Sequence, residues 1–405
     1  MADGESFDLP IDILVDILVR LPTSARRRFR LVCKRWRDAI DERTAERQVR
    51  TKILAFKSNR LSSRALVFDD DEEGRLRHEW IYSSASSLSD KVDMVGTCNG
   101  LICLHDSGQG EHTGITVANP ITGEALVLPP IPRFQDLNRR LGIYGFGYHP
   151  TTGQYKVVHV PSRISWRPDT VHVLTLDGSS SAWREVVSTF KHVGYYSHYG
   201  GGGVCVDGSA YWFDSFGDRI MALDLKDERL TSFPGPPGVR CMDMGMVVHD
   251  ATWKLTSVNA RLGVVFSSYK SAATRVDVWV LDGDAVEQPR WSRMYTLVVD
   301  RNVMNRSIVM TPHLTHGECI LSMSWDGKRL YRCKVDDCSD VDDGVTKQLL
   351  LSEGTELIMS EKTDSIRTFA YAETREPLPR VWESRRQRRR KKSGKFQSIG
   401  FNRIK

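Results

Sequence analysis

The sequence predicts an α+β protein in which a short helical segment precedes a large all-β domain. Apolar residues recur with helical spacing between Leu9 and Ile40. From Val92 onward, short runs of β-branched and aromatic residues alternate with turn residues instead. A chain of 405 residues has room for one small helical domain and one large β domain.

The first predicted helix lies between Leu9 and Pro22. Pro10 falls in its first turn, where a missing backbone N–H costs nothing, and Pro22 stops it. The apolar residues of this helix share one face, and they are Ile13, Leu14, Ile17, Leu18 and Leu21.

A second helix is expected to begin after Thr23 or Ser24. Its apolar face consists of Phe29, Val32, Cys33, Trp36 and Ile40, and its other faces carry arginine and lysine. Segments shorter than about forty residues rarely stabilise themselves without disulfides, metal or a partner. The exposed faces of this segment, residues 5–50, therefore either dock on the rest of the chain or bind a partner.

This segment resembles an F-box, the helical motif that joins a cullin–RING ubiquitin ligase of the SCF type through a Skp-type adaptor. The matching motifs are Leu9-Pro10, Ile13-Leu14, Ile17-Leu18, Leu21-Pro22, Arg28-Phe29 and Val32-Cys33-Lys34-x-Trp36. The resemblance implies that the adaptor is bound by Leu9, Pro10, Ile13, Leu14, Ile17, Leu18, Leu21, Pro22, Val32, Cys33 and Trp36.

One departure from the F-box pattern concerns the two residues before Arg28. The family usually has apolar residues there, often a Leu-Leu pair, and this chain has Arg26-Arg27. In the family these positions face the adaptor, so the two charges are expected to weaken binding or to alter the choice of adaptor.

Residues 51–91 are predicted to form a loosely ordered linker with short strands. The strand-like runs are Ile53–Phe56, Leu66–Phe68 and Glu79–Tyr82. The acidic run Asp69–Glu73 indicates a solvated loop, with contact to a basic partner as the alternative.

Residues 92–379 carry a repeated pattern of strands and turns. The clearest hairpin runs from Val95 to Leu104 and turns at Asn99-Gly100. Two pairs of turns, Thr122-Gly123 with Thr152-Gly153 and Asp177-Gly178 with Asp207-Gly208, are each separated by 30 residues. Repeats of short strands favour a β-propeller or a propeller-like array, with a β-sandwich as the alternative. Most tryptophans in this region are expected to pack between the repeats.

This region also resembles the F-box-associated domain of plant F-box proteins. The phrases that carry the resemblance are Gly96–Leu104, Asn119–Glu124 with Leu128–Pro130, and Gly145–Val158. In such proteins the domain is taken to present the protein that is to be ubiquitinated. The resemblance therefore implies a protein target as a second partner.

No set of residues in the sequence indicates catalysis. Cys98, Cys103 and His105 resemble a metal cluster, but they fall in a β-hairpin pattern without a second ligand pair at zinc-site spacing. The sequence predicts no cofactor, no metal and no enzymatic activity.

The net charge of +6 is unevenly divided along the chain. From Arg380 to the end there are eleven Lys or Arg residues against one acid, so residues 1–379 carry −4. Residues 380–405 are predicted to be a basic disordered tail. Its candidate nuclear-localisation residues are Arg385, Arg386, Arg388, Arg389, Arg390, Lys391 and Lys392.

Three roles are open for this tail: nuclear import through an import receptor, nucleic-acid contact, and simple solvation. Nucleic acid is the less favoured partner because few aromatic residues lie among the charges. No apolar window is long enough to span a membrane, and scattered cysteines without a secretory leader favour an intracellular protein. The expected location is the nucleus and cytoplasm.

Together these observations predict the substrate-recognition subunit of an SCF-type ubiquitin ligase. The alternative is an adaptor-independent nuclear scaffold or nucleic-acid-associated protein that uses the basic tail.

Overall fold

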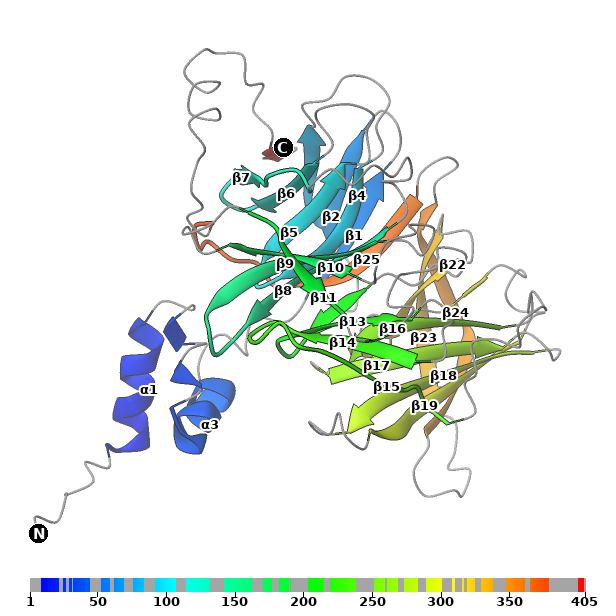
Figure 1. Ribbon diagram of the computed structural model, residues 1–405. Coiled ribbons are helices and arrows are strands. Elements are labelled where there is room, and N and C mark those ends of the chain that lie inside the picture. Colours follow the sequence, from blue (N-terminus) through cyan, green and yellow to red (C-terminus); the bar gives the residue numbers. More distant parts are fainter. Residues whose placement is uncertain are drawn as a thin grey trace, which may run out of the picture.

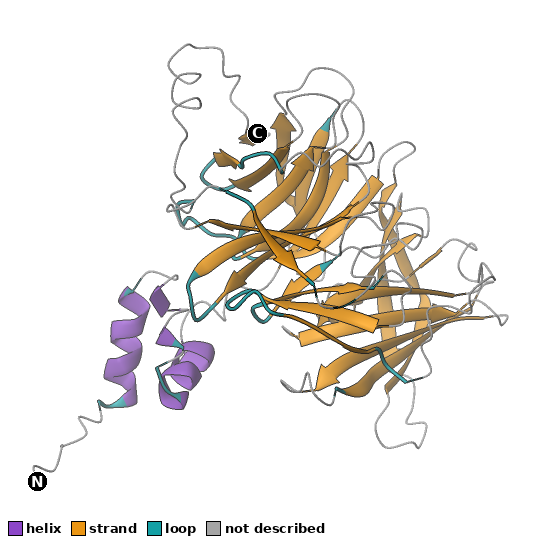
Figure 2. Cartoon of the chain, viewed as in Figure 1, coloured by secondary structure: helices purple, strands orange, loops and turns teal. Residues whose placement is uncertain are grey.

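The structure is a computed structural model that describes residues 9–21, 25–26, 29–30, 32–43, 52–58, 62–68, 76–83, 92–106, 114–131, 142–161, 170–176, 182–188, 190, 203–214, 219–237, 251–258, 261–268, 273–282, 289–300, 308–309, 315–316, 319–324, 329–337, 347–360, 365–378 and 400–403. Parts of the strands after residue 250 are described by their backbone alone. The described strands form five sheets, arranged as a five-bladed β-propeller (Figure 1). Helices occur at the N-terminal end of the chain (Figure 2).

The helical segment contains α1 (Ile11–Arg20), as the apolar periodicity predicts, and α3 (Lys34–Arg43). The second helix begins later than predicted, because Arg30 and Val32 lie in turns and Cys33 is not helical, so Phe29, Val32 and Cys33 precede α3. Pro10 is the N-cap of α1 and accepts a hydrogen bond from the backbone N–H of Leu14 at 3.1 Å. The helix ends at Arg20, because Leu21 adopts an extended conformation.

Two four-stranded blades follow the expected pattern. The first contains β4 (Val92–Cys98), β5 (Leu101–Asp106), β6 (Gly114–Asn119) and β7 (Glu124–Val127). The second contains β8 (Gly142–His149), β9 (Gln154–Pro161), β10 (Thr170–Leu176) and β11 (Arg184–Val187). The predicted hairpin turn is present between β4 and β5, where Asn99 and Gly100 have φ of 50° and 80°. Both values are those that a type I′ turn requires.

The third blade contains β12 (Val204–Val206), β13 (Ser209–Phe213), β14 (Arg219–Asp224) and β15 (Leu230–Pro234). The fourth begins with β16 (Ala251–Val258), β17 (Arg261–Ser268), β18 (Ala273–Asp282) and β19 (Arg290–Asp300). A parallel pairing of β19 with β24 extends it to a nine-stranded sheet. The added strands are β20 (Ile308–Val309), β21 (Thr315–His316), β22 (Cys319–Ser324), β23 (Arg329–Asp337) and β24 (Lys347–Ser360).

The fifth blade closes the ring with strands from both ends of the chain. Its order is β25 (Ser365–Tyr371), β1 (Lys52–Ser58), β2 (Ser63–Phe68), β3 (Leu76–Ser83) and β26 (Gly400–Arg403). The prediction of a linker over residues 51–91 is therefore wrong for the described parts of that range. The sequence predicts the short strands of this range. It does not predict that β1 pairs with β25, because the two strands are more than 300 residues apart and the residues near either strand do not indicate the pairing.

The predicted disordered tail also needs a correction. Residues 400–403 form β26, which pairs antiparallel with β3, from Gly400 opposite Ser83 to Arg403 opposite Trp80. The predicted nuclear-localisation residues, Arg385 to Lys392, lie outside the described residues. The propeller replaces the β-sandwich alternative.

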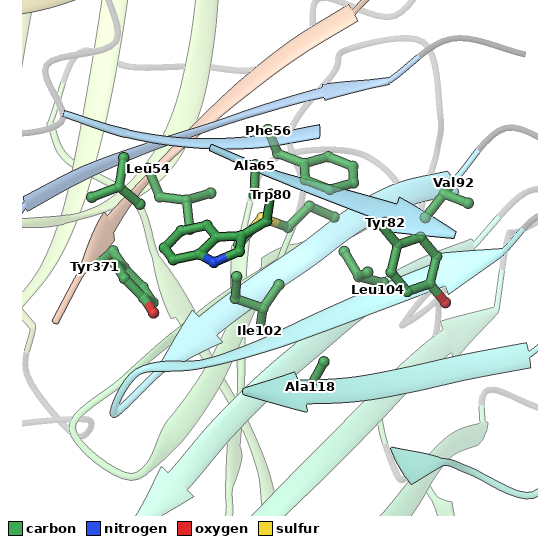
Figure 3. Packing of buried hydrophobic residues seen from close by; sticks show 12 residues of the cluster. Leu54, Phe56, Ala65, Trp80, Tyr82, Val92, Ile102, Leu104, Ala118 and Tyr371 are labelled. Carbon is green, nitrogen blue, oxygen red and sulfur yellow. The ribbon is translucent and has the colours of Figure 1, made fainter. Parts of the chain in front are cut away.

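The core between the closing blade and the first blade is built from large apolar side chains (Figure 3). Trp80, Tyr371 and Phe56 from the closing blade are fully buried against Ile102 and Leu104 of β5. Burying one such side chain contributes about 1.5–3 kcal/mol, so this core helps to hold the two ends of the chain together. Trp80 therefore packs between the closing blade and the first blade, although the sequence placed it in the linker.

Two tryptophans form equivalent polar joints between successive blades. Trp183 Nε1 donates to the Pro129 carbonyl at 2.9 Å, and Trp291 Nε1 donates to the Pro234 carbonyl at 3.2 Å. Each tryptophan thereby ties its own blade to the end of the preceding one. Among the described residues, no helix is long and apolar enough to cross a membrane.

Candidate functional site

The two N-terminal helices pack through a small apolar core of their own. Leu14 and Leu18 of α1 are 1% and 0% exposed, and they meet Ala39 and Ile40 of α3. The partly buried side chains around them are Ile11, Val15, Leu21, Phe29 and Trp36. Leu14 and Leu18 were expected on the adaptor-binding surface. In the structure they hold the helices together, because they lie on the side of α1 that faces α3.

A second apolar stripe of this helix pair faces solvent. Leu9, Ile13, Ile17 and Val32 are 41%, 49%, 43% and 58% exposed. Ile13 and Ile17 of α1, and Leu9 just before it, are four residues apart, so they lie along one side of the helix, and Val32 lies shortly before α3. Soluble domains rarely leave large apolar side chains grouped in this way, and such groups typically mark interaction sites. We call these four residues the apolar stripe.

The other predicted adaptor-binding residues have mixed exposure. Pro10 and Cys33 are exposed, Leu21 and Trp36 are half-buried, and Pro22 lies outside the described residues. Trp36 packs edge-on against Phe29, with ring centroids 5.4 Å apart. Its indole therefore supports the helix pair from the side.

Polar contacts fix the start of α1 against α3. Arg43 Nη1 lies 3.0 Å from Asp12 Oδ1, and the Arg35 guanidinium donates to the Leu9 carbonyl. Both charged side chains of the ion pair are more than half exposed, so this contact contributes at most about 1 kcal/mol. The Arg35 contact holds the backbone of Leu9 against α3.

Arg26, one of the two residues that depart from the F-box pattern, is 8% exposed. Its Nε and Nη1 atoms are buried and have no hydrogen-bond partner among the described residues. Arg27, the other residue, lies outside the described residues. A buried donor that loses its water without gaining a partner costs about 1–3 kcal/mol.

Replacing Arg26 by leucine is therefore expected to stabilise the helix pair by about 1–3 kcal/mol. Hydrogen exchange of the Leu14 and Leu18 amides in the full chain would measure this gain. Arg30→Leu, at an exposed position nearby, is the control and should change protection little. Faster exchange in Arg26→Leu than in the wild type would contradict this account of Arg26.

The propeller contains a stack of four rings, three from histidines and one from a tyrosine. It runs from His105 on β5 through Tyr144 on β8 to His159 on β9 and His172 on β10, with centroid separations of 4.2, 4.7 and 5.3 Å. The two Nδ1 atoms of His159 and His172 are 3.0 Å apart and share a hydrogen bond. Burial lowers the pKa of His159 to about 3 and also lowers the pKa of His105 and of His172.

These groups are not poised for acid–base or nucleophilic chemistry. Neutral imidazoles with such low pKa values are poor bases at neutral pH. Burial also raises the pKa of the Cys103 thiol well above its usual value, which disfavours the reactive thiolate. Within the described part of the chain, no three or more His, Cys, Asp or Glu residues are grouped to hold a metal ion.

Comparison with known proteins gives the same division of the chain. Residues 6–44 match the F-box domain family, and residues 53–333 match the family described as F-box associated beta propeller domain. The second match begins at β1, in agreement with the closing blade and not with a linker. An N-terminal F-box joined to a propeller defines the class of the protein. The chain belongs to the F-box proteins with an F-box-associated propeller domain.

Its relatives include several proteins from Arabidopsis thaliana. The F-box/LRR-repeat protein At2g43260 is 28% identical over 325 residues, which cover 74% of this chain and 70% of the relative. The F-box protein At3g07870 is 26% identical over 323 residues, covering 71% and 72%. These relatives support a plant origin for the chain.

Proposed function

We propose that this chain is the substrate-recognition subunit of an SCF-type cullin–RING ubiquitin ligase. The observation that carries the proposal is the apolar stripe Leu9, Ile13, Ile17 and Val32, which is exposed on a helix pair that already has its own core. The stripe binds a Skp-type adaptor and, through it, the cullin–RING ligase. The propeller binds a protein target that is to be ubiquitinated.

In this proposal the chain acts by proximity and carries out no chemistry itself. The end of α3 at Arg43 and the start of β1 at Lys52 are joined by residues 44–51. A connection of this length spans at most about 30 Å. It keeps the target-binding domain close to the adaptor, which raises the effective concentration of the target at the conjugating enzyme.

A single charge on the apolar stripe tests adaptor binding. Ile17→Asp is expected to reduce co-purification of a Skp-type adaptor at least tenfold. Burial of an isoleucine contributes about 1.5–3 kcal/mol, and about 1.4 kcal/mol corresponds to tenfold in affinity. The measurement is recovery of the adaptor on the immobilised full chain.

Val19→Asp is the matched control for this experiment. Val19 is 48% exposed, close to the 43% of Ile17, but it lies on the other side of the buried residues Leu14 and Leu18. Recovery of the adaptor should be unchanged in Val19→Asp. If both variants lose the adaptor equally, the stripe is not the binding surface.

Location in the nucleus and cytoplasm is a separate proposal. It is supported by the basic run from Arg385 to Lys392, which has the density of a nuclear-import signal.

A further inference from the structure

A pocket of about 470 Å³ lies where the propeller ring closes. His78 and Trp80 of β3 line it from the closing blade, and the turn Pro120–Gly123 between β6 and β7 lines it from the first blade. The last wall residue, Arg375, follows β25. Sites of about 300–1,000 Å³ commonly hold small ligands or a few side chains of a partner.

Asn119 holds the two walls of this pocket in a fixed arrangement. Its buried Nδ2 donates to the carbonyls of Thr374 and Glu376 at 3.1 and 2.8 Å. Its Oδ1 accepts the backbone N–H of Ile121 at 2.9 Å. One side chain therefore fastens both the turn and the segment that carries Arg375, so the pocket is largely formed before any ligand binds.

A second contact fastens the same segment further along. The Leu378 backbone N–H donates to Glu124 Oε2 at 3.0 Å, just beyond the turn. Arg375 thus lies between two anchored points of the backbone. Its own side chain is exposed, and the structure shows no hydrogen bond or ion pair for it among the described residues.

The pocket combines an apolar wall with positive charge at its rim. Trp80 and Pro120 are buried, and Ile121 is half-buried beside them. The Arg375 guanidinium is a permanent cation that favours carboxylate in a two-point contact. The neighbouring acid Glu373 is already engaged by Lys52, with Nζ 2.7 Å from Oε1, and by His78 at 3.2 Å.

We propose that this pocket binds an acidic peptide segment of the target protein. This inference rests on the proposed function, because it names the kind of segment that the propeller recognises. An Asp or Glu side chain of the target pairs with Arg375, and an adjacent aliphatic or aromatic side chain packs on the half-buried Ile121. The exposed rim at Thr122, Gly123 and Arg375 lets the peptide continue in both directions.

A random library of ten-residue peptides, selected on the complex of the full chain with the adaptor, tests the proposal. We expect the wild type to enrich peptides with an acid beside an aliphatic or aromatic residue. Arg375→Glu should reduce their enrichment at least tenfold. Arg229→Glu changes another exposed arginine, on the turn between β14 and β15, and should leave enrichment within twofold.

Three results would overturn the proposal: no enrichment by the wild type, enrichment without an acidic preference, or equal enrichment by Arg375→Glu. Adaptor binding is measured on the same preparations and should be unaffected by Arg375→Glu. Loss of the peptide preference with the adaptor still bound refutes only the pocket. A chain that fails to bind the adaptor refutes the proposed function, and the same selection on the chain alone then still tests the pocket.

Discussion

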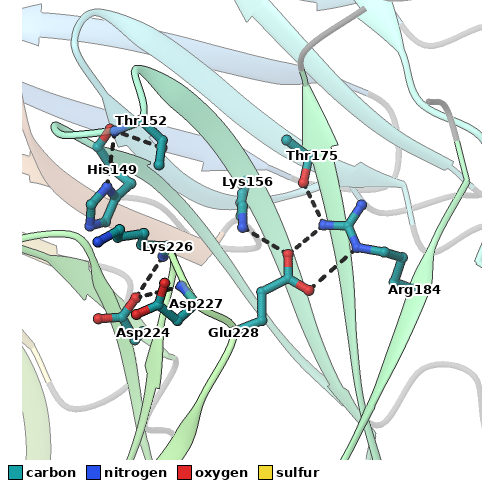
Figure 4. Close-up of polar contacts among 9 residues, drawn as sticks. All are labelled: His149, Thr152, Lys156, Thr175, Arg184, Asp224, Lys226, Asp227 and Glu228. Carbon is teal, nitrogen blue, oxygen red and sulfur yellow. Dashed lines mark hydrogen bonds and ion pairs between the residues drawn. The ribbon is translucent and has the colours of Figure 1, made fainter. Parts of the chain in front are cut away.

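Replacing Glu228 by glutamine is expected to lower the free energy of unfolding by about 3 kcal/mol. Glu228 lies in the turn between β14 and β15 and reaches across to the second blade (Figure 4). Its Oε1 is 2.7 Å from Lys156 Nζ, and its Oε2 accepts from Arg184 Nε at 3.3 Å. Arg184 also donates to Thr175 Oγ1 at 2.7 Å.

The size of this effect follows from the burial of Lys156, whose side chain is 4% exposed. Removing one partner of a buried ion pair leaves an uncompensated charge, which typically costs about 3–5 kcal/mol. Because the Arg184 side chain is 43% exposed, we expect a loss of unfolding free energy at the low end of this range. Burial alone would raise the pKa of Glu228, but hydrogen bonds from Arg184 and Lys156 outweigh it and lower that pKa, so the carboxylate is ionised at neutral pH.

Urea unfolding of the full chain measures this loss. Asp227→Asn is the matched control, since it removes the same charge from the preceding, exposed residue of the same turn. Such a surface change is expected to stay within about 0.5 kcal/mol. Equal stability of the two variants would show that the contacts of Glu228 with the second blade do not contribute to the free energy of unfolding.

The histidine stack is expected to make the propeller sensitive to acid. The folded-state pKa of His159, about 3, is below its ordinary value of 6.5, so the unfolded chain binds more protons between these values. The stabilising contribution is complete above about pH 6.5 and is lost as the pH falls toward 3. Between pH 7.5 and pH 5, His159 alone should reduce the free energy of unfolding by about 2 kcal/mol. His105 and His172, whose pKa values are also lowered, act in the same direction.

The slope of unfolding free energy against pH measures this contribution. His159→Phe keeps a ring in the stack between Tyr144 and His172 but cannot be protonated. Its slope between pH 6.5 and 5 should be shallower than that of the wild type by about 1.4 kcal/mol per pH unit at the acid end. An unchanged slope would mean that His159 is protonated equally in the folded and unfolded chain.

Local signals predicted much of this fold because they depend on residues close in sequence. Asn99-Gly100 and Asp207-Gly208 adopt the positive φ angles that a tight hairpin turn needs. Helix α1 follows the spacing of its apolar residues, whereas α3 begins at Lys34, after three of the five residues of the second predicted apolar face. The closing blade was missed because the pairing of β1 with β25 depends on strands at opposite ends of the chain.

The candidate site was predicted in composition but not in the role of each residue. Ile13 and Leu14 are adjacent, apolar and part of the same motif, yet one is exposed and the other is buried by α3. Which side of a wide apolar face meets α3 depends on where the second helix packs, and the sequence pattern does not contain that position. The burial of Arg26 was missed for the same reason, since charge predicts exposure unless the fold encloses the site.

Titration of the wild-type full chain with a purified Skp-type adaptor measures whether the F-box of this chain binds its proposed partner. We predict saturable binding of one adaptor per chain, and we expect the Ile17→Asp variant to bind at least tenfold more weakly. The double variant Arg26→Leu with Arg27→Leu is measured in parallel, because the two arginines are the departure from the F-box pattern. Binding by the double variant with none by the wild type would contradict the account and would indicate a degenerate F-box.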